Sequence, residues 1–208
     1  MDQHTPEWHV ARLGKATASR IADIVAKTKS GYSTSRANYA AQLVCERLTG
    51  VHADSFVSPA MAWGVEKEPE ARRLYEFERD LQAQKVGFID HPAIAMSGAS
   101  PDGFVGDVGL IEVKCPITAT HIDTLLGRSV PGRYVTQMQW QMAVTGRQWC
   151  DFVSYDPRLP LHLRLFIERV HRDAALIAQL EGEVSSFLAE VEATLAKLQS
   201  LTFQAEAA

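Results

Sequence analysis

The chain has 208 residues, of which 46% are hydrophobic, and it carries 21 Lys and Arg against 25 Asp and Glu. This composition is typical of one globular domain and excludes a disordered or fibrous protein. No apolar run reaches the roughly 18 residues of a membrane helix and no secretory signal is visible, so we expect a cytoplasmic protein without membrane partners. Three scattered cysteines, Cys45, Cys115 and Cys150, exclude a disulfide framework and a four-thiolate metal site, and we expect them to be buried apolar residues.

The formal net charge of −4 is unevenly distributed along the chain. Residues 1–50 hold seven basic and four acidic residues, whereas the chain from residue 168 onward holds three basic and seven acidic ones. This asymmetry indicates a basic face on an acidic molecule.

Helices are predicted for the first part of the chain. Thr17 or Ser19 is a suitable N-cap for a helix through IADIVAKT, and a second helix over ANYAAQLVCERLT ends at Gly50. A third helix carries EARRLYEFERD and tolerates Pro69 only if that residue falls in its first turn.

The hydrophobic period changes from residue 85 onward. The short runs KVGFIDHP, AIAMSGAS, GFVGDVG and GLIEVKCP are typical of strands and turns, and YVTQMQWQMAVTG predicts a helix that crosses the resulting sheet. Strands WCDFVSYD and HLRLFIERV and a closing helix over residues 172–199 follow. We therefore predict one mixed α/β or α+β domain over residues 1–208, with N-terminal helices at 15–50 and a core at 60–170, in which helices flank a central mixed sheet.

The closing helix carries one apolar stripe at spacings of three and four. A stripe that docks on the protein's own sheet is the commoner explanation and a contact between subunits the rarer one. Its members are Ile177, Leu180, Val184, Phe187, Val191 and Leu195.

Three polar residues around two predicted strands form the informative pattern of the sequence. Because side chains two apart share one face of a strand, Glu112 and Lys114 point the same way. Asp102 ends the preceding strand, and a hairpin would bring its carboxylate beside that of Glu112.

Two adjacent carboxylates repel each other unless a cation or protons offset their charge. Oxygen ligands favour Mg²⁺ or Mn²⁺, and the backbone carbonyl of Val113 is available as a further ligand. Lys114 can then orient or deprotonate a water molecule. Glu68 is our choice for a third acid, in preference to Glu66 and Glu70. The alternative is a chance pattern, since a Glu and a Lys on one strand are usually solvated surface.

The flanking residues match the PD-(D/E)xK nuclease core, which is a restriction-endonuclease-like fold. Over most of its length, from Trp8 to about Arg172, the sequence resembles the YqaJ/lambda-exonuclease family of phage recombination nucleases. The stretches that carry the resemblance are WHVARLGKATAS, AWGVEKEPEARRLYEF, SPDGF, LIEVKCPIT, YVTQMQWQMAVTG and FVSYDPR.

The resemblance implies a metal site in the core at 60–170. Asp102, Glu112 and the Val113 carbonyl resemble the family's metal ligands, and Glu68 resembles the upstream acid that completes the site. Lys114 matches the catalytic lysine that positions the attacking water. Two Mg²⁺ ions per site are implied, with Mn²⁺ as a possible substitute.

The resemblance also implies a pocket for a 5′-terminal phosphate. Its residues would be Arg12, Ser19, Ser100 and Gln137. The plain alternatives are that Arg12 is a surface cation, that Ser19 is a helix cap, that Ser100 shapes a turn and that Gln137 forms a hydrogen bond to the sheet.

Three further residues have open roles. Tyr134 and Gln139 lie beside the predicted crossing helix, where they would contact DNA or buttress the site. Met61 is a candidate wedge that splits the terminal base pair, although an apolar residue near a tryptophan usually packs.

The implied activity is that of an alkaline-type, Mg²⁺-dependent 5′-to-3′ exonuclease on double-stranded DNA. It would degrade one strand from a 5′-phosphorylated end, release mononucleotides and leave a 3′ overhang for single-strand annealing recombination. The resemblance also implies a homotrimeric ring and an annealing protein as partner. It implies a location in the cytoplasm of the bacterium that hosts the phage or prophage. An endonuclease with the same core and a non-catalytic DNA-end-binding module are the alternatives.

Overall fold

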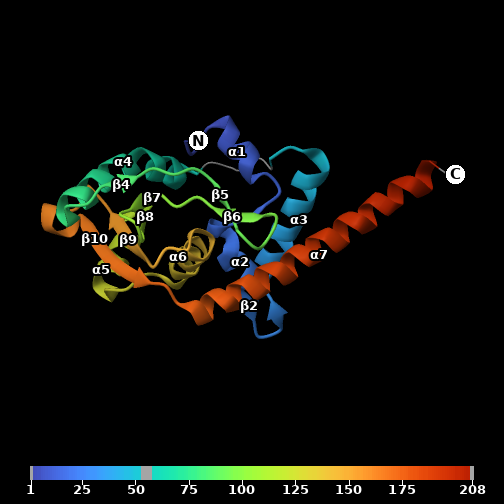
Figure 1. The fold of residues 1–208 in the computed structure, drawn as a ribbon. Helices are drawn as coiled ribbons and strands as arrows, with labels where there is room; N and C mark the ends of the chain where they lie inside the picture. Colours follow the sequence, from blue (N-terminus) through green and yellow to red (C-terminus); the bar gives the residue numbers. More distant parts are fainter. Residues whose placement is uncertain (1, 53–57, 207–208) are drawn as a thin grey trace.

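A five-stranded mixed sheet forms the centre of the fold in the computed structural model, which describes residues 2–52 and 58–206 (Figure 1). The strand order is β10-β9-β8-β7-β4, and only the β8–β9 pair is parallel within this sheet. The mixed α+β architecture is therefore as predicted. The strands are β4 (Ala83–Gln84), β7 (Gly103–Val105), β8 (Gly109–Lys114), β9 (Trp149–Tyr155) and β10 (Leu165–His171).

Two helices cover the two faces of this sheet. Helix α4 (Pro59–Arg79) buries Ala71 and Tyr75 with Ile111 on one face. Helix α6 (Gly132–Thr145) buries Met138 and Met142 on the other face with Leu110. Residues alternate between the faces along a strand, so the even-numbered positions of β8 point toward α6. A shorter helix, α5 (Thr118–Gly127), contacts β9.

A smaller, three-stranded sheet joins the N-terminal segment to the central part of the chain. Its order is β1-β6-β5, with β1 parallel to β6. Helices and a hairpin surround it, and the elements of this region are α1 (Pro6–Arg12), β1 (Ala16–Thr17), the 3₁₀ helix η1 (Ala18–Arg20), α2 (Ile21–Val25), β2 (Lys27–Thr28), β3 (Gly31–Tyr32), α3 (Thr34–Thr49), β5 (Ile89–Asp90) and β6 (Ser97–Ala99). A second 3₁₀ helix, η2 (Leu161–Leu163), precedes β10.

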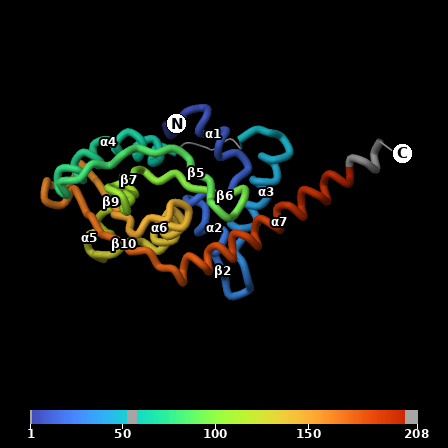
Figure 2. Tube along the Cα trace, in the orientation of Figure 1, coloured from blue at the N-terminus to red at the C-terminus, as the bar shows by residue number. Residues whose placement is uncertain are grey.

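The closing helix α7 (Ala174–Glu206) lies against the N-terminal helices and extends beyond them (Figures 1 and 2). Its predicted apolar stripe is buried, mainly in a core shared with α2 and α3. The expectation that the stripe docks on the sheet is therefore wrong for most of its length. The alternative, a contact between subunits, is also wrong, because these side chains are covered within the chain.

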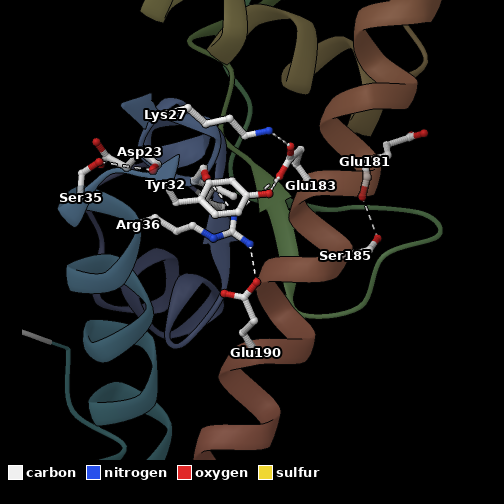
Figure 3. Close-up of polar contacts among 10 residues, drawn as sticks. Asp23, Lys27, Tyr32, Ser35, Arg36, Glu181, Glu183, Ser185 and Glu190 are labelled. Carbon is white, nitrogen blue, oxygen red and sulfur yellow. Dashed lines mark hydrogen bonds and ion pairs between the residues drawn. The ribbon is translucent and has the colours of Figure 1, made fainter. Parts of the chain in front are cut away.

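Polar contacts attach the β2–β3 hairpin and α3 to α7 (Figure 3). The guanidinium of Arg36 lies 2.7 Å from Glu190 and 4.0 Å from the ring centre of Tyr32. Glu183 accepts hydrogen bonds from the Lys27 ammonium at 2.8 Å and from the Tyr32 hydroxyl at 2.6 Å. Part of the basic excess of residues 1–50 is thus neutralised by α7, which reduces the basic face predicted from the charge distribution.

The structure corrects several predicted element boundaries. Helix α4 begins ten residues before Pro69, so this proline lies inside the helix rather than in its first turn. Ser58 caps the N-terminus of α4, because its hydroxyl accepts a hydrogen bond from the backbone N–H of Met61. The first predicted helix is divided into η1 and α2 and ends at Val25, where the β2–β3 hairpin begins.

Other predictions about single residues have mixed outcomes. Helix α3 ends before Gly50 as predicted, and Gly50 has a φ of 68°. Ser19 lies inside η1 rather than before a helix. Cys115 and Cys150 are buried, but Cys45 is exposed on α3, contrary to expectation. Among the described residues, no helix is long and apolar enough to cross a membrane.

Candidate active site

The β7–β8 hairpin places Asp102 beside Glu112. Gly103 pairs with Ile111 in the antiparallel register, so Asp102 lies opposite Glu112 just beyond the paired residues. The Oδ2 atom of Asp102 accepts a hydrogen bond from the backbone N–H of Val113 at 2.6 Å. The structure therefore brings these residues together as the hairpin argument predicts.

Glu112 is buried, and its carboxylate has three donors. The side-chain amide of Gln137 donates to Oε1 at 2.6 Å, and that of Gln141 donates to Oε2 at 2.6 Å. The ammonium of Lys114 forms an ion pair with Oε1. A buried carboxylate needs such donors because burial removes the water that would otherwise solvate its charge.

Negative charge accumulates around Asp102. Its burial, together with the charges of Glu112 and Glu68, raises the pKa of the Asp102 carboxyl well above its ordinary value, although Lys114 and the Val113 N–H oppose this shift. Burial alone would lower the pKa of the Lys114 ammonium, but Glu112 and Asp102 outweigh it and raise that pKa. Lys114 is thus a firmly protonated cation, which favours orienting a water molecule over deprotonating one.

Glu68 lies on α4 and lines the same cleft as Asp102 and Glu112. It pairs with Arg72 at 3.2 Å, and Arg72 also donates to the backbone carbonyl of Asp102. The rejected candidates have other partners: Glu66 pairs with Lys67, and Glu70 accepts a hydrogen bond from the Tyr155 hydroxyl at 2.5 Å. The preference for Glu68 agrees with its position.

The donor set suits a hard divalent cation. Glu68, Asp102 and Glu112 are three of the carboxylates that line the cleft, and the raised pKa of Asp102 means that an added positive charge would stabilise its ionised form. Within the described part of the chain, however, no three His, Cys, Asp or Glu side chains are arranged as a ready metal cage. Lys114 and the Val113 N–H hold carboxylate oxygens instead, so a cation would have to compete for those atoms.

The cleft has a volume of about 1130 Å³ and extends from these acids to α1, to η1 and to Ser100, which follows β6. Its lining includes every predicted site residue except Gln139. The full predicted set in the lining is Arg12, Ser19, Met61, Glu68, Ser100, Asp102, Glu112, Val113, Lys114, Tyr134 and Gln137.

Two of the predicted phosphate-binding residues share one aromatic neighbour. The indole Nε1 of Trp8 donates to the Ser100 hydroxyl at 2.9 Å, and the Arg12 guanidinium lies 3.9 Å from the centre of the Trp8 ring. Within residues 2–52 and 58–206, the buried Nε atom of Arg12 has no hydrogen-bond partner. This part of the cleft therefore offers a cation and a hydroxyl to an anion.

The remaining predicted residues differ in their surroundings. Met61 is 53% exposed at the cleft, and the Tyr134 ring centre lies 5.3 Å from the Lys114 ammonium. Gln139 is buried and bonds to the backbone of His171 and Asp173, away from the cleft. Its predicted DNA contact is therefore wrong, because successive residues of α6 point to different sides of the helix.

Several residues of the site escaped the sequence analysis. Arg72 and Gln141 each lie four residues after a predicted site residue on the same helix, and this spacing was the available signal. Cations of the cleft that were also missed are Lys15, Arg20 and Arg133.

Residues 7–148 match the YqaJ-like viral recombinase domain. The chain belongs to this family. It is similar to an alkaline exonuclease from Laribacter hongkongensis, LHK-Exo, with 53% identity and a TM-score of 0.90 over 96% of this chain and 99% of that one. The crystal structure of LHK-Exo in complex with dAMP gives 54% identity and a TM-score of 0.91 over the same shares.

A more distant likeness supports the fold of this YqaJ-family chain. A phage-related exonuclease from Haemophilus somnus 129PT is 18% identical, with a TM-score of 0.73 over 88% of this chain and 96% of that one. No protein with a curated description matches the sequence.

Proposed function

We propose that the protein is a Mg²⁺-dependent 5′-to-3′ exonuclease that degrades one strand of duplex DNA from a 5′-phosphorylated end. Its products are mononucleotides and a 3′ overhang suited to single-strand annealing recombination. The observation that carries the proposal is the convergence of Asp102, Glu112 and Lys114 in one cleft, in a chain 53% identical to an alkaline exonuclease. The dAMP bound to a relative is a mononucleotide of the proposed product class.

The proposed metal ligands are Asp102, Glu112, the Val113 carbonyl and Glu68. Bound Mg²⁺, two ions in our proposal, would supply a nucleophilic water and charge stabilisation at the scissile phosphate, and Mn²⁺ is expected to substitute. The Lys114 ammonium positions that water and adds positive charge where the phosphorane oxygens become negative. Its pairing with Glu112 places this charge at the wall of the cleft.

Binding of the terminal phosphate explains the polarity that we propose. Arg12 and Ser100, held by Trp8, would bind the 5′-phosphate, with Ser19 and Gln137 nearby in the same cleft. Contacts to phosphate carry no base information, so the enzyme would read the end of the duplex rather than its sequence. Met61 and Tyr134 are the proposed contacts to the strands next to this end.

We also propose that three copies form a ring around the duplex and that the 3′ overhang is passed to an annealing protein. The formal charge of −4 fits a ring in which only the channel is basic. A mass measurement of the native protein in solution tests the trimer, and a monomer at working concentration would exclude it. Co-purification with an annealing protein from the same genome tests the partner.

One assay tests the activity. Linear duplexes with 5′-phosphate or 5′-hydroxyl ends and covalently closed circles are incubated with Mg²⁺ or with a chelator. We expect mononucleotides only from linear DNA with Mg²⁺, and faster release from phosphorylated ends. Cleavage of closed circles would indicate an endonuclease instead, and binding of ends without release would indicate a non-catalytic module.

A further inference from the structure

Two glutamines of α6 hold the two oxygens of the Glu112 carboxylate. Gln137 and Gln141 are four residues apart, so they lie one above the other on the same face of the helix. Their amides donate to Oε1 and Oε2 respectively, each at 2.6 Å. The plane of the carboxylate is therefore fixed from α6, although Glu112 itself belongs to β8.

Gln141 differs from Gln137 in its access to the cleft. Gln137 is part of the cleft lining, whereas Gln141 is fully buried behind Glu112. The thiol of Cys150 lies 4.0 Å from Oε1 of Gln141, which leaves the amide nitrogen facing Glu112. Gln141 is thus shielded from a substrate, and Glu112 is the site residue to which its amide donates.

The chemistry of the donors distinguishes the two oxygens of Glu112. Oε1 faces the positive charge of Lys114, but the donor to Oε2 is the neutral amide of Gln141. A neutral amide satisfies the hydrogen-bonding capacity of a buried carboxylate without cancelling its charge. A carboxylate held in this way keeps its negative charge for a cation, and its plane has a fixed orientation.

We infer that Gln141 is a positioning residue, which fixes the Glu112 carboxylate for binding a divalent cation. This inference rests on the proposed function, because it assigns Glu112 to the metal site. Partners that orient a metal ligand typically contribute a factor of about 10 to 100 in metal affinity or activity. Gln141 is expected to fall in that range.

The test measures Mn²⁺ binding to the full chain by electron paramagnetic resonance, without DNA. Q141M removes the amide and nearly preserves the volume. We expect about 10- to 100-fold weaker Mn²⁺ binding and a lower kcat at fixed Mg²⁺. The KM for DNA should stay unchanged, and higher Mn²⁺ should restore part of the activity.

Q139M is the matched control, because Gln139 is another buried glutamine of α6 whose partners lie at His171 and Asp173. It should bind Mn²⁺ as the wild type does. Unchanged Mn²⁺ affinity in Q141M, with the wild type active, would overturn the role of Gln141. If Q141M does not fold, Q141N replaces it in the test, because asparagine keeps the amide but is one methylene too short to reach Glu112. Wild-type Mn²⁺ affinity in Q141N would equally overturn the role of Gln141. An inactive wild type that binds Mn²⁺ would count against the exonuclease proposal alone.

Discussion

The Lys114 ammonium and the Glu112 carboxylate, two residues apart on β8, form an ion pair at the wall of the cleft. The side chain of Glu112 is 1% exposed and that of Lys114 is 28% exposed, so the carboxylate lies behind the ammonium. A substrate phosphate that enters the cleft would meet the cation before the acid. This order suits a lysine that stabilises negative charge during the reaction.

We expect Lys114→Ala to lower turnover on linear duplex DNA by about 100-fold or more. The substitution removes the charge at the developing phosphorane and leaves Gln137 and Gln141 on Glu112. Metal binding should therefore be retained, because Lys114 competes with a cation for Oε1 of Glu112, and DNA binding should remain roughly at the wild-type level. Single-turnover rates at saturating Mg²⁺, with a separate DNA-binding titration in a chelator, measure the two effects independently.

Lys85→Ala is the control for this prediction, since Lys85 is exposed and lies outside the cleft. It removes the same charge and should react at the wild-type rate. A wild-type rate in Lys114→Ala would refute the assignment of the lysine.

The β7–β8 hairpin could be predicted from the sequence because its signals are local. Alternation fixed the common face of Glu112 and Lys114, and the turn between the strands fixed their position opposite Asp102. The observed hydrogen bond from Val113 to Asp102 follows from that register.

Contacts that depend on packing could not be predicted in the same way. Nothing in the period of α7 distinguishes a partner helix from a partner sheet, because both bury the same stripe. The hydrogen bond between Gln141 and Glu112 joins a helix to a strand. To predict it, one would need to know where α6 crosses the sheet. Pro69 suggested a late start for α4 because propensity argues against proline inside a helix, but tertiary packing prevailed.

Arg12→Ala should abolish the preference for 5′-phosphorylated over 5′-hydroxyl ends. The guanidinium is held against Trp8, and its buried Nε has no hydrogen-bond partner among the residues that the structure describes. A charge-assisted pair with the phosphate would be lost. The measurement is the ratio of the degradation rates of the two linear duplexes.

The control for Arg12→Ala is Lys29→Ala, which removes an exposed N-terminal cation from outside the cleft. Its ratio should equal that of the wild type. If the ratio in Arg12→Ala also stays unchanged, Arg12 does not bind the terminal phosphate.

Arg36→Met should lower the free energy of unfolding by about 2–4 kcal/mol. Arg36 is 3% exposed, donates to the backbone carbonyl of Ile24 at 2.8 Å and pairs with Glu190 (Figure 3). Its loss leaves the buried Ile24 carbonyl without this donor and the more exposed Glu190 without its cation. Urea unfolding gives the value. Lys27→Met removes a more exposed ion pair with Glu183 and should lower the free energy of unfolding less than Arg36→Met does. Equal losses in the two variants would contradict the importance of burial at Arg36.

Asp102→Asn should stabilise the metal-free protein at alkaline pH. Burial, with the charges of Glu112 and Glu68, raises the pKa of Asp102 well above its ordinary value of 3.8. As the pH rises from that value to the raised pKa, the unfolded chain loses this proton first, so the free energy of unfolding falls. Asparagine does not ionise and retains an oxygen that can accept from the Val113 N–H.

In a chelator at pH 8, Asp102→Asn should be more stable than the wild type. The difference should vanish below about pH 3.8, where the Asp102 carboxyl of the wild type is protonated in both the folded and the unfolded state. Mg²⁺ should then stabilise the wild type more than the variant, because only an ionised Asp102 attracts the cation. Thermal melts across pH, with and without Mg²⁺, measure these effects, and Asp107→Asn on the exposed β7–β8 turn should behave as the wild type does. A variant less stable than the wild type at pH 8 in chelator would mean that the ionised carboxylate of Asp102 is favourable without a metal, because Lys114 and the Val113 N–H together outweigh its acidic neighbours.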